Sequence, residues 1–287
     1  MKSHRRFIYV LTLPVVIVLF GLLIFPLIYT LFISTQSTLE GLDNMSFVGL
    51  KNYYDFLTSP VIHHSVLITI VFVISTLSAT TLFGFFIALL LNDIKRGAAI
   101  FRTLIIIPLA IAPVVAGLTW RVMLDPLFGV VNYLIGFIGI PPLGWAAEIK
   151  TALFTLIIVD TWQWTPFMTI ILYAGLQMLP VDVFEAGKID GVSRFQEITY
   201  ITIPLLKPLF IIALIFRFMD AFKSFDIIYA ITKGGPGHAT ETLVIRAFFE
   251  TFKYHKHEVG AVIGVFLLIV TFAMTKFALK ALEAKDA

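Results

Sequence analysis

Residues 180–204 read PVDVFEAGKIDGVSRFQEITYITIP, and this polar, charged stretch stands in a chain that is otherwise strongly apolar. Of the 287 residues, 59% are hydrophobic and only 14% are charged, and the mean hydropathy is +0.96. Soluble domains carry about 25% charged residues, so the composition excludes both an ordinary soluble enzyme and a disordered chain. The stretch is therefore expected to connect membrane helices outside the bilayer.

Helix start and stop signals divide this stretch into two short helices. Pro180 opens the first, and Glu185 lies in an early turn, where the helix dipole favours an acid. Gly191 stands where a C-terminal glycine ends such a helix. Ser193 and Gln196 have the spacing of a capping box, which starts the second helix. Residues 180–204 are thus predicted to form a helix-turn-helix, here called the elbow, a shape suited to docking in a groove of a partner protein.

Six apolar runs outside the elbow are each long enough to cross a bilayer, which needs about 20 residues of helix. They predict an all-α integral membrane protein with six transmembrane helices in a single membrane domain of residues 1–287. Lys and Arg are more frequent in the connections on the side of the elbow, which places that side and both termini in the cytoplasm. The expected spans are residues 8–33, 66–91, 103–124, 151–174, 208–232 and 259–282.

Ionisable and aromatic residues interrupt the fourth and fifth spans. Such ionisable residues are rare within membranes and face a bundle interior or water. One interpretation is a path for a sugar, whose hydroxyls bind carboxylates and amides and whose flat faces stack on indole rings. The other is structural, with Arg217 and Lys223 each pairing with an acid three residues further along the helix. The residues concerned are Asp160, Trp162, Gln163, Trp164, Arg217, Asp220, Lys223 and Asp226.

The elbow resembles the EAA loop of ABC-transporter permeases. That loop reads Glu-Ala-Ala, three residues, Gly, nine residues, Ile, one residue and Leu-Pro. Here Gly187 and Ile203 replace an Ala and the Leu of the pattern, and the spacing is unchanged. Gly187 weakens the first helix by up to about 1 kcal/mol relative to Ala. The matching segments are Glu185-Ala186-Gly187, Gly191, Ile201 and Ile203-Pro204.

Further segments along nearly the whole chain resemble carbohydrate-type members of that family. The resemblance implies a type I ABC importer permease fold and one permease subunit of a binding-protein-dependent sugar importer, in the inner membrane of a prokaryote. It also implies three partners: a second permease subunit, a dimer of cytoplasmic ABC ATPases and an extracytoplasmic solute-binding protein. The segments are 47–53, 101–108, 113–115, 120–121, 175–177, 234–236 and 240–243.

By the same resemblance, the elbow is the part that the ATPase grips. Glu185 would meet a basic group of the ATPase, and Gly191 would permit the turn. The chain lacks the Walker A pattern that cradles phosphates, so ATP and Mg²⁺ are expected on the partner ATPase, with no cofactor and no catalytic residue on this chain. The ATPase-coupling residues that the resemblance implies are Glu185, Ala186, Gly187, Asp190, Gly191, Ile201 and Pro204.

Metal ions and nucleic acids are not expected as ligands. His257 and Glu258 lack the His-Glu-x-x-His spacing of a zinc hydrolase because Ala261 stands where the second His should be. Cysteine is absent, which excludes thiolate metal sites. The formal net charge of +3 is too small to indicate a nucleic-acid partner, and membrane lipid is the expected surroundings.

An ion-gradient-driven secondary transporter is the alternative function. Asp160, Asp220 and Asp226 could serve such a mechanism inside the membrane. No inverted repeat of the kind that many such transporters carry is visible in the sequence, and the elbow would have no role in one. A membrane-embedded enzyme is less favoured still, because the catalytic spacings are missing.

Overall fold

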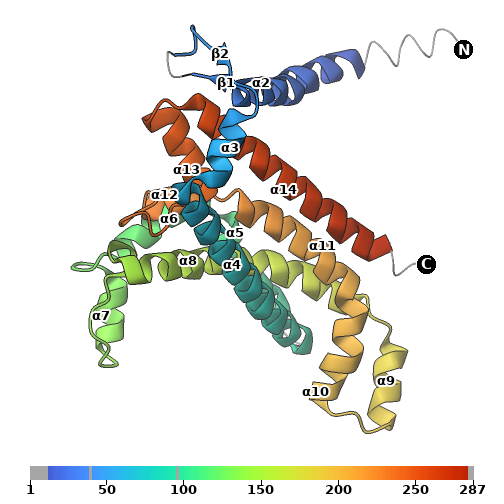
Figure 1. Ribbon diagram of the computed structural model, residues 1–287. Coiled ribbons are helices and arrows are strands. Elements are labelled where there is room, and N and C mark those ends of the chain that lie inside the picture. The colour runs from blue at the N-terminus through green and yellow to red at the C-terminus, as the bar shows by residue number, and fades with distance from the viewer. Residues whose placement is uncertain (1–11, 39–40, 95–96, 284–287) are drawn as a thin grey trace, which may run out of the picture. The chain divides into compact units, whose positions relative to one another are not determined.

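A computed structural model describes residues 12–38, 41–94 and 97–283 (Figure 1). Residues 8–11 of the first expected span and both ends of the chain lie outside the described residues. The chain divides into two compact units, Met1–Ser65 with Arg246–Ile269, and Val66–Ile245 with Val270–Ala287. The single membrane domain expected from the sequence remains a prediction.

The first unit contains an apolar helix over Thr12–Ser34 followed by a short hairpin. Asn52 ties the two together, because its side-chain Nδ2 donates to the carbonyl oxygens of Ser34 at 3.0 Å and Gln36 at 2.7 Å. The elements are η1 (Phe20–Ile24), α2 (Phe25–Ser34), β1 (Gln36–Ser37) antiparallel to β2 (Ser46–Phe47), α3 (Lys51–Thr58), the first turns of α4 (Pro60–Asp93), the end of α13 (Leu243–Phe248), η4 (Phe249–Lys253) and the first part of α14 (His257–Glu283).

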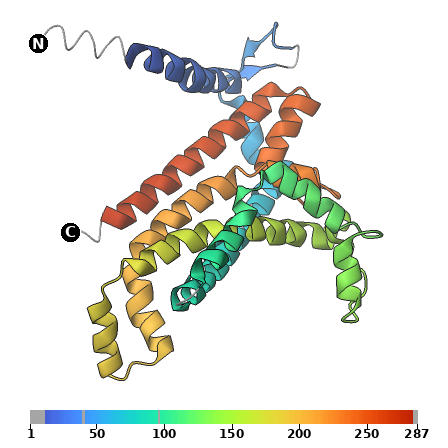
Figure 2. The same ribbon diagram turned by 180° about the vertical axis from the view of Figure 1, so that it is seen from behind.

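The second unit contains the rest of α4 and the helices around it. Buried apolar side chains from α4, α8 and α11 form its core, and they include Ala88, Met168 and Leu206. Figure 2 shows these three helices crossing one another. The remaining elements are α5 (Ala98–Ala110), α6 (Pro113–Met123), α7 (Val130–Gly136), η2 (Trp145–Ala147), α8 (Ile149–Gln177), α9 (Val181–Ile189), α10 (Arg194–Gln196), η3 (Glu197–Thr202), α11 (Ile203–Phe222) and α12 (Asp226–Ile231).

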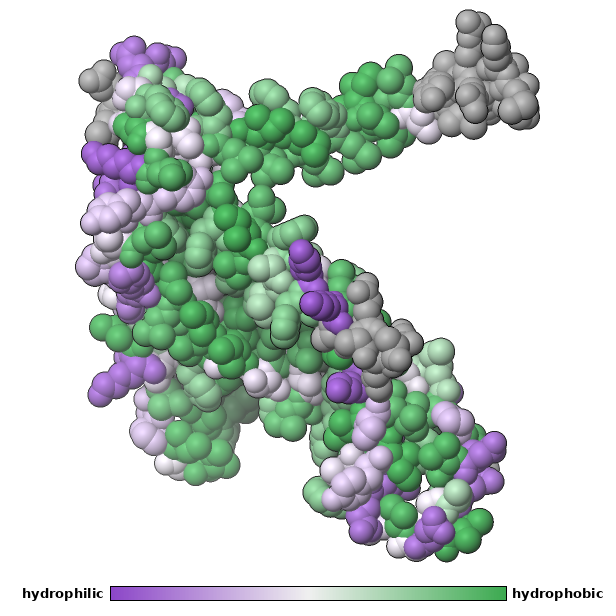
Figure 3. Space-filling view, turned by 45° about the vertical axis from the view of Figure 1, so that its right-hand side comes forward, coloured by the Kyte–Doolittle hydropathy of each residue, from purple (hydrophilic) through white to green (hydrophobic). Residues whose placement is uncertain are grey.

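Length and apolar composition identify the membrane helices. Among the described residues, four helices could each cross a bilayer, and two bent helix pairs raise the total to six if each pair is one span. Figure 3 shows apolar residues over most of the visible helix surface, with polar residues on the elbow and on several other exposed segments. The expectation of a largely helical membrane protein is therefore confirmed. The four helices are Thr12–Ser34, Pro60–Asp93, Arg194–Phe222 and His257–Lys280.

Two expected spans are interrupted. The run 103–124 is formed by α5 and α6, which meet at an angle of 93°. Pro113 explains this break, because the residue before a proline avoids the helical conformation, and Ala112 is extended with ψ 134°. The run 208–232 is likewise two helices, since α11 ends at Phe222 and α12 begins at Asp226. Hydropathy alone does not reveal either break.

Candidate functional site

The first arm of the elbow is α9, and it ends as the sequence predicts. Gly191 adopts φ +75°, the left-handed conformation that favours glycine. The Val192 N–H donates to the Gly187 carbonyl at 2.9 Å, and the Gly191 N–H donates to the Lys188 carbonyl at 3.2 Å. These two bonds form a Schellman motif, which satisfies the last carbonyls of the helix. The turn between the arms is therefore closed by the backbone itself.

The second arm starts at the predicted capping box. The Gln196 N–H donates to Ser193 Oγ at 3.4 Å, and the Ser193 N–H donates to Gln196 Oε1 at 2.9 Å. From there the helix does not stop at Pro204 but runs without interruption from Arg194 to Phe222. The π-helical turn η3 lies just before Pro204, and the Ile203 N–H donates across it to the Ile198 carbonyl, so the helix continues past a residue that has no N–H to donate. The second arm and α11 are thus one rod.

The residues that the EAA-like pattern singles out lie at different depths. Glu185 and Ala186 on α9 and Asp190 directly after it are exposed, so a partner can reach them. Gly187 is buried instead, because Ile201 of the second arm packs over it. A Cβ at position 187 would lie 3.2 Å from Ile201 Cδ1, a separation tighter than ordinary packing. The two arms lie side by side (Figure 1), and the glycine leaves room for Ile201 where the EAA pattern has an alanine.

Replacing Gly191 with alanine should loosen the elbow. The added Cβ meets no atom within 4 Å, so the cost is the left-handed backbone alone, about 1–2 kcal/mol. Proteolysis of the turn in detergent-solubilised chain should accelerate roughly 5- to 30-fold. Gly136→Ala is the matched control, since that Cβ also meets nothing within 4 Å and Gly136 has no positive φ. Equal cleavage rates in both variants would contradict the expectation.

The buried charges of the fourth and fifth expected spans meet each other. Arg217 on α11 forms an ion pair with Asp160 on α8, and both side chains are fully buried. Arg217 Nη1 also donates to Asp220 Oδ2 at 3.4 Å, and the guanidinium lies 5.3 Å from the ring centre of Trp164. The expected pair of Arg217 with Asp220 is thus present, but the sequence pattern does not reveal the partner on α8.

Gln163 on α8 supports the break in the third expected span. Its Nε2 donates to the carbonyl oxygen of Ile111 at 2.8 Å, between the two helices α5 and α6. A backbone carbonyl freed by a helix break needs such a partner at membrane depth. Within the part of the chain that the structure describes, four buried polar atoms of this region still have no hydrogen-bond partner: Asp160 Oδ1, Thr161 Oγ1, Gln163 Oε1 and Arg217 Nε.

Other candidates for the substrate path are accessible. Trp162 is 36% exposed and contacts Trp120 of α6 edge to face, with ring centres 5.3 Å apart. Asp220 is partly exposed, and Lys223 and Asp226 are exposed on either side of the break between α11 and α12. The expected pairing of Lys223 with Asp226 assumed that both residues lie three positions apart on one helix. The break separates them, so this spacing does not apply. The candidates thus form an enclosed group (Asp160, Gln163, Arg217 and the partly buried Trp164) and an accessible group (Trp162, Asp220, Lys223 and Asp226).

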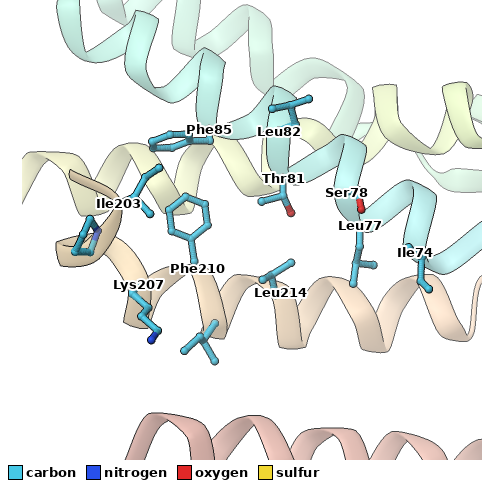
Figure 4. Close-up of a pocket in the computed structure, with 12 residues that line it drawn as sticks. Ile74, Leu77, Ser78, Thr81, Leu82, Phe85, Ile203, Lys207, Phe210 and Leu214 are labelled. Carbon is cyan, nitrogen blue, oxygen red and sulfur yellow. The ribbon is translucent and has the colours of Figure 1, made fainter. Parts of the chain in front are cut away.

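A groove between α4 and α11 is apolar throughout most of its length. Its volume is about 960 Å³. Figure 4 shows Phe85, Leu77 and Phe210 along its walls, with Lys207 at one end. Ser78, Thr81 and Lys207 are the polar side chains among its lining residues. Such a lining offers few hydrogen-bond partners to a sugar, so a polar cargo would find better contacts in the accessible group.

The acidic and histidine side chains of the described residues do not gather into a metal site. Among residues 12–38, 41–94 and 97–283, no group of three or more His, Cys, Asp or Glu side chains could hold a metal ion. His257 and Glu258 lie at the start of α14. Glu258 accepts a hydrogen bond from Thr38 in the first unit, which gives this glutamate a structural role.

Comparison with known proteins places the fold and the motifs in a family. The family model described as "Binding-protein-dependent transport system inner membrane component" matches residues 80–285. The trehalose/maltose transport system permease protein MalF of Thermococcus litoralis is 36% identical over 268 residues, which cover 93% of this chain and 90% of that protein.

Two solved structures share the fold. The crystal structure of a bacterial ABC transporter involved in the import of the acidic polysaccharide alginate matches with a TM-score of 0.85 at 19% identity, covering 99% of this chain and 98% of that chain. A bacterial alginate ABC transporter in complex with its alginate pentasaccharide-bound periplasmic protein matches with a TM-score of 0.83 at 19% identity, covering 96% and 94%. The expected importer permease fold is confirmed. The chain belongs to the family of inner-membrane components of binding-protein-dependent transport systems, as a multi-pass transport subunit and not an enzyme.

Proposed function

We propose that this chain is the permease subunit of an ATP-driven importer for a sugar or a sugar-like solute. Its partners are a second permease subunit, a dimer of ATPases that binds ATP and Mg²⁺, and an extracytoplasmic solute-binding protein that delivers the cargo. The sugar class is supported by the relative named as a trehalose/maltose permease and by the carbohydrate-type motifs of the sequence.

The elbow is the observation that carries the coupling proposal. Its first arm exposes Glu185 and Ala186, and its second arm continues without interruption into α11. A partner that grips the first arm therefore pulls on a rod that reaches into the membrane. ATP binding to the ATPase supplies the difference in affinity between two states of the permease, which a conformational shift requires. The coupling residues are Glu185, Ala186, Gly187, Asp190, Gly191, Ile201 and Pro204.

The accessible group is the proposed contact for the cargo. Trp162 offers an indole ring to a sugar face, and the break between α11 and α12 exposes Lys223 and Asp226. Broken membrane helices are tolerated where the irregular backbone is buried in protein or lines a cavity, and in many transporters they form the binding site. The enclosed group instead holds α8 to α11 and supports the break at Ile111.

Reconstitution tests the proposed function. The full chain is assembled in proteoliposomes with the second permease and the ATPase that co-purify with it, and the uptake of labelled maltose and trehalose is measured. Uptake is expected only with ATP on the ATPase side and with the solute-binding protein on the other side. The chain alone, under a proton or sodium gradient without nucleotide, is expected to accumulate neither sugar. Accumulation in that control would favour the secondary transporter.

A further inference from the structure

The last residues of α4 contact the end of α8, just before the elbow, and the start of the second arm. Gln177, the last residue of α8, donates from Nε2 to Asn92 Oδ1 at 2.5 Å. Arg194, the first residue of the second arm, donates from Nη2 to both carboxylate oxygens of Asp93 at 2.9 Å. Two consecutive residues of α4 therefore hold the chain where it enters the elbow and where the second arm begins.

Arg194 also forms an ion pair with a second carboxylate. Its Nη1 donates to Glu197 Oε1 at 2.6 Å, within the second arm. The guanidinium thus bridges a carboxylate of α4 and a carboxylate of the elbow through charge-assisted hydrogen bonds. The side chains of Arg194 and Asp93 are 51% and 57% exposed, and such exposed pairs contribute little to folding. The contact adds little to overall stability. Its importance lies in the position in which it holds the elbow.

We propose that Asn92 and Asp93 are positioning residues that seat the elbow on α4, so that α4 moves together with the second arm during transport. This inference rests on the proposed function, because the motion of the elbow comes from the ATPase. Two helices would then transmit the motion of the elbow into the membrane. The first is the second arm with α11, and the other is α4, held to that arm through Asp93 and Arg194.

A movement of α4 together with the second arm would also displace a contact near the other end of α4. The hydroxyl oxygen of Thr69 accepts a hydrogen bond from the Leu243 N–H at 2.8 Å, and both residues are buried. Leu243 follows the turn that contains Gly234 and Pro236. Thr69 and Asp93 are separated by about 36 Å of continuous helix, so α4 links the elbow to this turn. Between them, Phe85 packs edge to face against Phe210 of α11, with ring centres 5.2 Å apart.

Cross-linking tests the seating of the elbow. The chain has no cysteine, so Asp93→Cys with Arg194→Cys introduces a unique thiol pair for a short bifunctional thiol reagent. We expect intramolecular cross-linking in the full chain in membranes, and none in either single variant. Because the two positions move together and the link replaces the contact that the substitutions remove, ATP-driven maltose or trehalose uptake by the cross-linked transporter should equal or exceed that of the unlinked variant. Loss of uptake on cross-linking would overturn the proposal.

A double-mutant cycle tests whether the pair transmits motion. Asp93→Asn and Arg194→Gln should each lower uptake per ATP hydrolysed by about fivefold. If the two residues act through one contact, uptake per ATP hydrolysed in the double variant should be no lower than in the more impaired of the two single variants. Lys280→Gln, an exposed charge on α14, is the control and should leave the ratio unchanged. Losses that multiply in the double variant, or no loss in either single variant, would contradict the proposal.

The two experiments separate this inference from the proposed function. Cross-linking yield reports the seating of the elbow whether or not an ATPase is present. A chain that cross-links but never shows ATP-driven uptake contradicts the proposed function. If the unlinked double-cysteine variant takes up sugar and the cross-link stops that uptake, only the joint movement of α4 and the second arm is contradicted.

Discussion

Arg217→Ala should destabilise the chain by about 3–5 kcal/mol, as expected when one partner of a buried ion pair is removed. The variant leaves the Asp160 carboxylate fully buried, and Oδ1 of that carboxylate already has no hydrogen-bond partner among the described residues. An ionised group without a partner at membrane depth is strongly unfavourable. The measurement is denaturant unfolding of the purified chain in mixed micelles, followed by tryptophan fluorescence.

Two further variants show whether the loss comes from the unpaired charge. Asp160→Leu combined with Arg217→Met removes both charges and keeps side-chain volume, and such replacements are often neutral or stabilising. Most of the lost stability should therefore return in the double variant. Lys223→Ala is the control, because Lys223 is exposed beyond the end of α11, and it should change stability by no more than about 0.5 kcal/mol. A double variant as unstable as Arg217→Ala would mean that packing around the site, and not the charge, causes the loss.

Transport by the double variant separates the two roles considered for these residues. If the enclosed group is structural, a stable double variant should take up maltose or trehalose normally. Trp162→Ala, in the accessible group, should instead weaken uptake while ATP hydrolysis continues. Normal uptake in Trp162→Ala together with lost uptake in the stable double variant would place the cargo contacts in the enclosed group.

Local signals in the sequence predicted the elbow in detail. The positive φ of Gly191 and the capping box of Ser193 with Gln196 lie where the residue types place them. These features depend on contacts within a few residues, which is why sequence reasoning reaches them. Pro204 does not end the second arm, since a π-helical turn precedes it and the helix continues to Phe222, and no simple sequence pattern predicts such a turn.

Contacts between distant segments could not be predicted in the same way. Arg217 pairs with Asp160, 57 residues away, in addition to the acid one turn along its own helix. Asp93 and Arg194 are 101 residues apart, and nothing in either segment marks the other as its partner. The break after Phe222 was also missed, because hydropathy averages over Lys223 and Ser224. A run of hydrophobic residues therefore predicts that a segment enters the membrane, but not whether it crosses as one helix.

Glu185→Lys should uncouple transport from ATP hydrolysis. Glu185 is exposed on α9, so the change should leave the fold intact within about 0.5 kcal/mol. The reversed charge repels the basic group of the ATPase that the resemblance to the EAA loop implies as the partner of Glu185. Uptake per ATP hydrolysed should fall by at least about tenfold, within the range of typical coupling free energies. The measurement is uptake of labelled sugar and phosphate release in the same proteoliposomes.

The continuity of the elbow explains why one exposed residue should have so large an effect. The Schellman motif and the capping box close the turn between the arms, and the second arm is one helix with α11. A displacement of α9 is therefore passed to α11 with little loss in the turn. Asp182→Lys, one turn earlier on the same helix, is the matched control and should reduce the ratio much less. If uptake per ATP hydrolysed falls equally in both variants, the effect comes from general charge repulsion and not from a specific contact at Glu185. Normal uptake in Glu185→Lys would show that the elbow is not part of the coupling mechanism.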